Sequence, residues 1–455
     1  MSNYIQKNKA FYKTMLIIAL PVVIQHLISI GLNMADTVMV SSLGENAISA
    51  VGLANRFYFV FSVICFGIYS GSSIFIAQYW GAGDTKNIKK VFGINLIIGS
   101  LLSALFSILI FLFPDKILRI FINDSEVISL GVDYLKIAAF SYFFTSISFA
   151  YSFSSRAIHK LKAPTVVNAV ALLINTSLNY VLIYGYYGFP ELGVKGAAIA
   201  TVISRIFEFF TMIFIIYKDK DHPLAGSFKD FTSWDIPLLK DVIKTSLPVI
   251  LSETAWSVGT SVYFIAYGFL GSYAIAVVQI STTISDFFQA LFFGLGSSCA
   301  VMIGNEIGKN KIDNAFDYSK KFIKLTLTMS IILSILLFLF KGQIIKFYNL
   351  EQDTIYYLDK ALIVFSIYFT PKMFSYMFII GILRSGGDTK FCMFIDIVSI
   401  WFIGIPLSFI TVLYFHLPIH LVMAVVFSEE VLKLFVLINR YKSKKWINNL
   451  VIKYD

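Results

Sequence analysis

The chain has 455 residues, of which 57% are hydrophobic and 14% are charged, and its mean hydropathy is +0.77. Soluble domains carry roughly 25% charged residues, so this composition excludes an ordinary soluble protein and indicates an all-α polytopic membrane protein. The net charge of +10 does not require a nucleic-acid partner, because the basic residues gather on one side of the predicted spans.

The first residues predict a membrane helix and not a cleaved leader. Residues 1–13 are short and basic, and the apolar run that follows outlasts a signal-peptide core and has no small-residue cleavage site. The apolar runs of the chain extend over roughly 20 to 28 residues, long enough for spanning helices and too long for barrel strands. The three cysteines lie far apart in such runs, which predicts neither a disulfide framework nor a metal site.

Hydropathy predicts twelve spans in two six-helix lobes. The spans are 14–40, 48–78, 91–113, 130–153, 165–187, 195–217, 241–268, 275–302, 318–340, 356–383, 391–413 and 419–438. They divide the chain into an N-terminus (1–13), an N-terminal lobe (14–217), a linker (218–240), a C-terminal lobe (241–438) and a basic tail (439–455).

The basic residues orient these spans in the membrane. Twenty-six Lys and Arg residues fall in the segments on one side, including Arg384, and five fall on the other. Positive segments stay in the cytoplasm, so we expect a multi-pass plasma-membrane protein whose N-terminus, linker and C-terminal tail are cytoplasmic.

The first span carries an acid on a polar stripe. Gln25, Ser29, Asn33 and Asp36 are spaced four, four and three residues apart, so they share one face of a helix. A carboxylate inside a membrane is costly and marks a functional site by default, although a structural Asp bonded to a neighbouring helix is the alternative. Pro21 precedes the stripe and predicts a kink or hinge.

The two halves repeat at an offset of 227 residues. The offset maps Leu20-Pro21-Val22 onto Leu247-Pro248-Val249, Leu43-Gly44 onto Leu270-Gly271, and Gly81 onto Gly308. An even number of intervening spans gives both copies the same orientation, as in transporters built from parallel repeats, with a substrate cleft expected between the lobes. Asp36 maps onto Tyr263, so we expect the ion chemistry to lie in the N-terminal lobe.

Spans five and six offer partners for Asp36. Asn175 and Asn179 lie one turn apart, and Thr201 adds a hydroxyl. They can hydrogen-bond Asp36 or ligate a cation, or they can hold helices together. Arg205 and Glu208 are three residues apart and are predicted to neutralise each other.

The second half carries further charged groups. Glu253 is either a second titratable site or the partner of a basic group such as Lys372, and Asp286 and Asp396 are weaker buried candidates. Glu429, Glu430 and Lys433 are predicted to form a self-neutralising cluster. Tyr263 and Phe264 can line a cleft whose aromatic faces accept an organic cation.

Motifs for other chemistry are missing from the sequence. No GxxxxGK[ST] phosphate-binding motif is present, so transport driven by ATP hydrolysis is not expected. The five His residues show no metal-ligand spacing. We therefore expect no cofactor and no metal site.

Together the spans, the repeat and several segments resemble the multidrug and toxic compound extrusion (MATE) family. The segments that carry the resemblance are Leu20-Pro21 with Asp36, Gln78 to Lys90, Asn175 to Thr201, Gly308, and Leu383 to Lys390. The resemblance implies an exporter of mostly cationic, amphipathic compounds that is driven by inward flow of H⁺ or Na⁺.

The resemblance is nearer to the DinF-like than to the NorM-like branch. A DinF-like cation site would use Asp36, Asn175, Asn179 and Thr201. The NorM-like branch places acids on spans seven and ten, where this chain has Glu253 one turn early, Trp256 at the expected place, and Lys372.

We therefore expect a monomeric antiporter that works by alternating access, is not an enzyme, and has small organic cations and the lipid bilayer as its partners. Two alternatives stay open at this point. A flippase for lipid-linked saccharide would favour a cleft rich in Arg and Lys, and a membrane-embedded lipid-modifying enzyme would need clustered acids or His near one interface.

Overall fold

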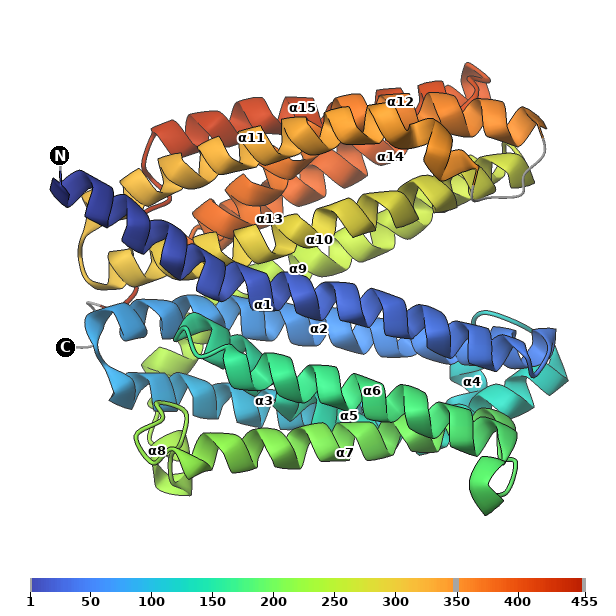
Figure 1. Cartoon of the computed structure of the whole chain (residues 1–455), viewed down its shortest axis with the longest axis horizontal. Helices are drawn as coiled ribbons and strands as arrows, with labels where there is room; N and C mark the ends of the chain where they lie inside the picture. Colours follow the sequence, from blue (N-terminus) through green and yellow to red (C-terminus); the bar gives the residue numbers. More distant parts are fainter. Residues whose placement is uncertain (1, 347–351, 452–455) are drawn as a thin grey trace. The chain divides into compact units, whose positions relative to one another are not determined.

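The computed structural model describes residues 2–346 and 352–451, and every regular element within those ranges is a helix (Figure 1). The α-helices are α1 (Ser2–Ser41), α2 (Glu45–Ala82), α3 (Thr85–Leu112), α4 (Pro114–Arg119), α5 (Ser125–Ala157), α6 (Lys162–Tyr184), α7 (Gly193–Lys218), α8 (Phe228–Thr232), α9 (Ile236–Gly268), α10 (Ser272–Gly308), α11 (Ile312–Ile345), α12 (Gln352–Tyr376), α13 (Thr389–Ile397), α14 (Ile405–Phe409) and α15 (Ile419–Lys442). Short 3-10 turns form η1 (Tyr186–Gly188) and η3 (Arg384–Gly386), and π-helical segments form η2 (Met377–Leu383), η4 (Val398–Gly404) and η5 (Ile410–Tyr414).

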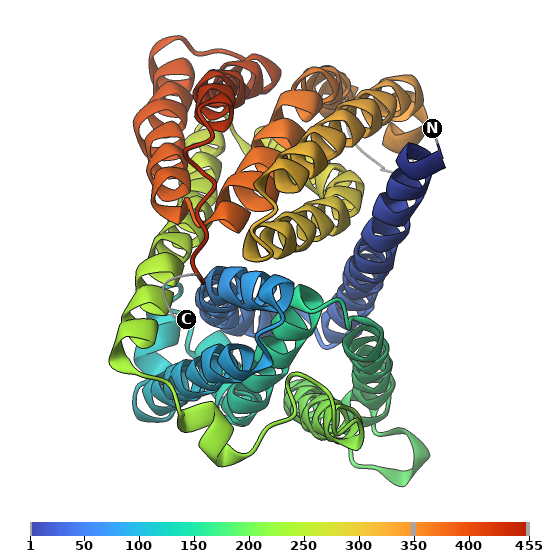
Figure 2. The ribbon, with the colours of Figure 1, turned by 90° about the vertical axis from the view of Figure 1, so that its left-hand side faces the viewer.

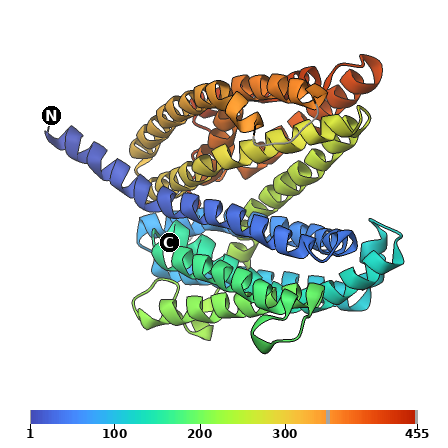
Figure 3. The same cartoon turned by 45° about the vertical axis from the view of Figure 1, so that its right-hand side comes forward.

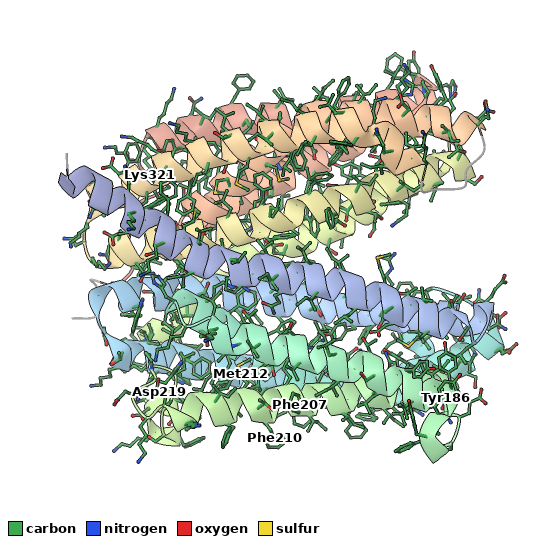
Figure 4. All side chains as sticks on the ribbon, viewed as in Figure 1. Tyr186, Phe207, Phe210, Met212, Asp219 and Lys321 are labelled. Atoms are coloured by element: carbon green, nitrogen blue, oxygen red, sulfur yellow. The ribbon has the colours of Figure 1, made fainter. Side chains whose placement is uncertain are left out.

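Within the described ranges, eleven helices are long and apolar enough to cross a membrane. They correspond to the first eleven predicted spans. The twelfth predicted span lies in α15, which is long enough but carries Glu429, Glu430 and Lys433 near its middle. Large apolar side chains such as Phe210 (Figure 4) and Phe214 on α7 are exposed, as expected for a surface that faces lipid.

The chain folds into two compact units. The N unit is Ile24–Ser246, and the C unit combines Met1–Val23 with Leu247–Asp455. The boundaries fall inside α1 and α9, close to the repeat-equivalent residues Pro21 and Pro248. The units therefore differ from the expected lobes at the ends of α1 and α9, and the lobe boundaries 14–217 and 241–438 stay a prediction.

In the N unit, α5 packs against α2, α3 and α7, while α6 lies along α7 (Figures 2 and 3). Small residues permit the close approach of α2, α3 and α5. Gly99 has no side chain, and the Tyr69 hydroxyl occupies that space, 2.6 Å from Ser146 Oγ. Ser146 Oγ in turn donates to the Gly99 carbonyl at 3.0 Å. Buried polar groups thus tie the centre of this unit together.

In the C unit, α12 packs against α10, α11 and α15, which is the same neighbour pattern that α5 has with α2, α3 and α7. The repeat extends to backbone conformation. Gly44 and Gly271 precede equivalent helices with φ of 100° and 105°, and Gly83 and Asn310 have φ of 81° and 57°. Positive φ is available to glycine at no steric cost, which accounts for the pair Gly44 and Gly271. The internal repeat predicted from the sequence is therefore present in both units.

The C-terminal tail folds back onto the turn after η2. Trp446 is fully buried, and its indole Nε1 donates to the Tyr441 carbonyl at 3.2 Å. Asn448 Nδ2 donates to the Gly386 carbonyl at 3.0 Å. At the start of the unit, Lys321 Nζ donates to Asn8 Oδ1 at 2.7 Å, beside the first turns of α1 (Figure 4).

Candidate functional site

Asp36 lies on α1 within the N unit and faces α6. Asn179 Nδ2 donates to Asp36 Oδ1 at 2.9 Å, and Thr176 Oγ1 lies 3.4 Å from the same oxygen. Asn175 and Asn179 are both buried, and Asp36 itself is partly buried. The structure therefore brings Asp36 together with the two asparagines of predicted span five.

The Asn175 amide links Asp36 to α7. One orientation of the Asn175 side-chain amide gives both its nitrogen and its oxygen a hydrogen-bond partner. In this orientation the nitrogen donates to Asp36 Oδ2 at 2.9 Å, and the oxygen accepts from the Thr201 backbone nitrogen at 3.2 Å. The Thr201 hydroxyl donates to the Ala197 carbonyl at 3.0 Å. Thr201 therefore closes the site from α7, next to Asn175.

The site can hold a proton or a small cation. A carboxylate, two amides and hydroxyls supply the oxygen ligands that hard cations prefer. Asn179 Oδ1 is buried and has no hydrogen-bond partner among the described residues. A buried acceptor without a hydrogen bond costs free energy, so Asn179 Oδ1 is available to a proton-bearing group or a cation at Asp36. Thr176 was missed in the sequence analysis, although its position between the two asparagines on the same helix could have indicated it.

The remaining predicted residues of the stripe lie along α1. Gln25 and Ser29 are partly buried and Asn33 is exposed. Pro21 lies inside α1, which continues through it as one helix. The substrate-cleft role of Gln25, Ser29 and Asn33 and the hinge role of Pro21 stay predictions.

Arg205 and Glu208 neutralise each other, as predicted from their spacing. Arg205 Nη1 lies 2.6 Å from Glu208 Oε2, and Asn168 Nδ2 donates to Glu208 Oε1 at 3.3 Å. Arg205, the cation that acts electrostatically on Asp36, is therefore already paired, and the groups that hydrogen-bond Asp36 are neutral donors.

A second group of charged residues lies in the C unit. Arg384 Nη1 donates to Glu253 Oε1 at 2.6 Å, and Arg384 Nη2 donates to Ser252 Oγ at 3.1 Å. Asp396 accepts from Ser252 Oγ at 2.6 Å and lies 3.7 Å from Arg384. Lys433 lies 3.8 Å from Asp396 and 3.3 Å from Glu430.

Three expectations for this group need correction. The charge count places Arg384 in a cytoplasmic loop, but this residue is only 4% exposed and pairs inside the unit. Glu253 does pair with a basic group, which was one of its two alternatives, but that group is Arg384 and not Lys372, whose Nζ donates to Ser285 Oγ at 3.2 Å. Asp286 is exposed, so it is not the buried acid that the sequence predicts. The π-helical segment η2, which precedes Arg384, shifts the helix register and is not visible in hydropathy.

The predicted cluster of Glu429, Glu430 and Lys433 forms only in part. Lys433 pairs with Glu430, whereas Glu429 Oε2 accepts a hydrogen bond from the Tyr263 hydroxyl at 3.0 Å. Tyr263 stacks on Tyr267, and Phe264 meets Tyr267 edge to face. An aromatic cleft at Tyr263 and Phe264 stays a prediction.

Comparison with known proteins identifies the family. The MatE family model matches residues 21–181 and 248–410. A probable multidrug resistance protein, YoeA of Bacillus subtilis, is 28% identical over 385 residues, covering 83% of this chain and 81% of YoeA. A probable multidrug resistance protein NorM of Thermotoga maritima is 25% identical over 455 residues, covering 97% of this chain and 96% of that protein.

Solved structures have the same fold. A crystal structure of a MATE protein in complex with MaL6 superposes with a TM-score of 0.86 at 20% identity, covering 95% of this chain and 96% of that one. A mutant of the Vibrio cholerae MATE transporter VcmN gives a TM-score of 0.88 at 16% identity, covering 97% and 98% of the two chains. The family model spans both halves of the chain, and this protein therefore belongs to the MATE family of multidrug efflux transporters, which are membrane-embedded transporters and not enzymes.

Proposed function

We propose that this transporter exports amphipathic organic cations in exchange for H⁺ or Na⁺, with Asp36 as the coupling residue. The observation that carries the proposal is the environment of Asp36. It is a partly buried carboxylate that receives hydrogen bonds from Asn175, Asn179 and Thr176, while the nearby Arg205 is paired with Glu208. The carboxylate thus remains available for an exchangeable cation.

The negative charge of Asp36 explains how the coupling ion and the cargo exchange at this residue. Inside a membrane, an ionised carboxylate without a cation is unfavourable, so Asp36 binds either the coupling ion or a positively charged cargo. A ligand shifts a two-state transporter only by its difference in affinity between the two states. Entry of the coupling ion at Asp36 therefore releases the cargo in one state, and loss of the ion restores binding in the other.

The coupling ion determines what the amides must do. In the hydrogen-bonded arrangement, the NH₂ groups of Asn175 and Asn179 point at the Asp36 oxygens. Na⁺ requires these amides to turn their oxygens toward Asp36, with Thr201 as a further oxygen. A proton on Asp36 requires one acceptor, which Asn179 Oδ1 supplies after the same rotation. The neutral, rotatable amides are compatible with both ions.

Names of relatives support the cargo class. YoeA and the Thermotoga maritima NorM are both described as probable multidrug resistance proteins. Multidrug transport by this chain, its place in the plasma membrane with cytoplasmic termini, and its action as a monomer are parts of the proposal.

The test is transport by purified protein in proteoliposomes loaded with a fluorescent lipophilic cation such as ethidium. A pH gradient and a Na⁺ gradient are imposed separately and then together, with collapse of each gradient by an ionophore as control. We expect uphill ethidium movement that follows one of the two gradients. Movement that is independent of both gradients would contradict antiport.

A further inference from the structure

A second acid site lies in the C unit at the place that corresponds to Asp36. By the repeat, Tyr263 of α9 takes the position of Asp36 of α1, and its hydroxyl donates to Glu429 Oε2 of α15 at 3.0 Å. Glu429 is 6% exposed. The C unit thus has a carboxyl group at this place, although its sequence has no acid at the equivalent position of α9.

The sequence of α15 shows where this acid comes from. Ala200, Val202 and Ser204 of α7 recur with the same spacing as Ala424, Val426 and Ser428 of α15, and this alignment places Glu429 opposite Arg205. In the N unit the acid is on α1, and its hydrogen-bond partners Asn175, Thr176 and Asn179 are on α6. In the C unit the hydroxyl of Tyr263 is on α9, the equivalent of α1, and the acid is on α15.

The cations near Glu429 form their ion pairs with other carboxylates. Arg384 pairs with Glu253 at 2.6 Å and reaches Asp396 at 3.7 Å. Lys433 pairs with Glu430 at 3.3 Å and reaches Asp396 at 3.8 Å. A third cation, Lys372, acts on Glu430, so four carboxylates (Glu253, Asp396, Glu429 and Glu430) lie beside three cations. Among the ion pairs of the described residues, none includes Glu429.

The groups that face Glu429 are Tyr263 and Tyr267 from α9, Asp396 from α13, and Glu430 and Lys433 from its own helix. From η4, Gly404 approaches so closely that a Cβ atom there would overlap both the Tyr263 hydroxyl and Glu429 Oε2. Only glycine leaves room for this contact. The backbone of η4 therefore shields the carboxyl group from water.

We propose that Glu429, held by Tyr263, is a second proton-binding site, which carries its proton in the state described by the structure. Tyr263 donates to Oε2, and the proton resides on Oε1, so the group is neutral and the buried charges of the C unit come closer to balance. Release of this proton leaves a carboxylate beside Asp396 and Glu430, and that repulsion is relieved by movement of Lys433 toward Glu429. This proposal rests on the proposed function, because it adds a proton to the exchange assigned to Asp36.

The test is infrared spectroscopy of the purified protein near neutral pH, with difference spectra between wild type and variants. We expect a protonated-carboxyl band that is lost in Glu429→Gln and is retained in Glu126→Gln, a control that alters an exposed acid at the start of α5. Tyr263→Phe should keep the band and move it to higher frequency, because one hydrogen bond to the carbonyl oxygen is removed. A spectrum of Glu429→Gln identical to that of wild type in this region would overturn the proposal.

A transport measurement separates this proposal from the proposed function. Under imposed pH gradients, the number of protons exchanged per ethidium should fall by one in Glu429→Gln, with ethidium still moving uphill. Asp36→Asn should abolish uphill movement while leaving the Glu429 carboxyl band in place. Unchanged stoichiometry in Glu429→Gln would overturn the second proton site alone, whereas uphill movement by Asp36→Asn would overturn the proposed function alone.

Discussion

Removal of Arg384 is predicted to be among the most destabilising single changes in the C unit. Its guanidinium is 4% exposed and serves Glu253, Ser252 and Asp396 together. Arg384→Met leaves the largely buried Glu253 without a cation, and breaking a buried ion pair from one side costs about 3–5 kcal/mol. Glu253→Gln should cost less, about 1–3 kcal/mol, because Arg384 keeps Asp396 and the amide still accepts a hydrogen bond.

The double variant separates ion pairing from simple loss of packing. Replacing both members of a buried pair by apolar groups is often close to neutral. Arg384→Met combined with Glu253→Met should therefore be more stable than Arg384→Met alone. The assay is equilibrium unfolding in mixed micelles by titration with SDS. Additive losses in the double variant would refute the role of pairing. Glu253→Gln should also retain measurable exchange, since Asp36 is the proposed coupling residue.

Three further predictions concern the tail, the linker and the topology. Gly386→Ala should destabilise the protein by about 1–3 kcal/mol in the same assay, because the added Cβ meets the Trp446 backbone and ring; equal stability would contradict the packing of the tail. Burial, with a smaller contribution from Lys160, lowers the pKa of His222 from 6.5 to about 4. Between these pH values the unfolded linker binds a proton that the folded linker does not, so the folded linker loses stability as the pH falls. Hydrogen-exchange protection of residues 219–235 should therefore decrease as the pH drops from 6.5 toward 4. His222→Gln should remove that pH dependence, and a pH-independent wild type would count against it. In a background without native cysteines, Glu45→Cys should react with an impermeant reagent from outside intact cells and Lys86→Cys should not; the reverse pattern would invert the topology.

Helical periodicity and the cost of a membrane carboxylate predicted Asn175 and Asn179 as neighbours of Asp36, but not Thr176. Asn175 and Asn179 share one face of an apolar helix because they are spaced by about one turn, and a membrane offers that face no water to bond. Such amides therefore need a polar partner on a neighbouring helix. The repeat was equally visible, since Leu20-Pro21-Val22 and Leu43-Gly44 recur at an offset of 227 residues, and Gly44 and Gly271 share a positive φ in the structure.

The charged group of the C unit was harder to predict for physical reasons. Arg384 follows a π-helical segment, in which backbone hydrogen bonds join residues five apart and not four. The residues after this segment therefore face a different direction from the one that an α-helical wheel predicts. It also resembles a positive-inside arginine, because hydropathy cannot tell a paired guanidinium from a solvated one. Glu429 lies at pairing distance from Lys433 along the helix, but the contact with Tyr263 joins residues 166 positions apart. Such contacts depend on tertiary packing.

The central claim is that ionisation or cation binding at Asp36 drives export. The most direct measurement is ethidium efflux from proteoliposomes that contain Asp36→Asn, with wild type and Glu126→Gln reconstituted in parallel. Asparagine preserves size and hydrogen bonding but cannot titrate or carry the charge that binds a cation. We predict normal folding, normal incorporation into the vesicles, and no uphill efflux under either gradient. Uphill efflux by Asp36→Asn at the wild-type rate would contradict the claim.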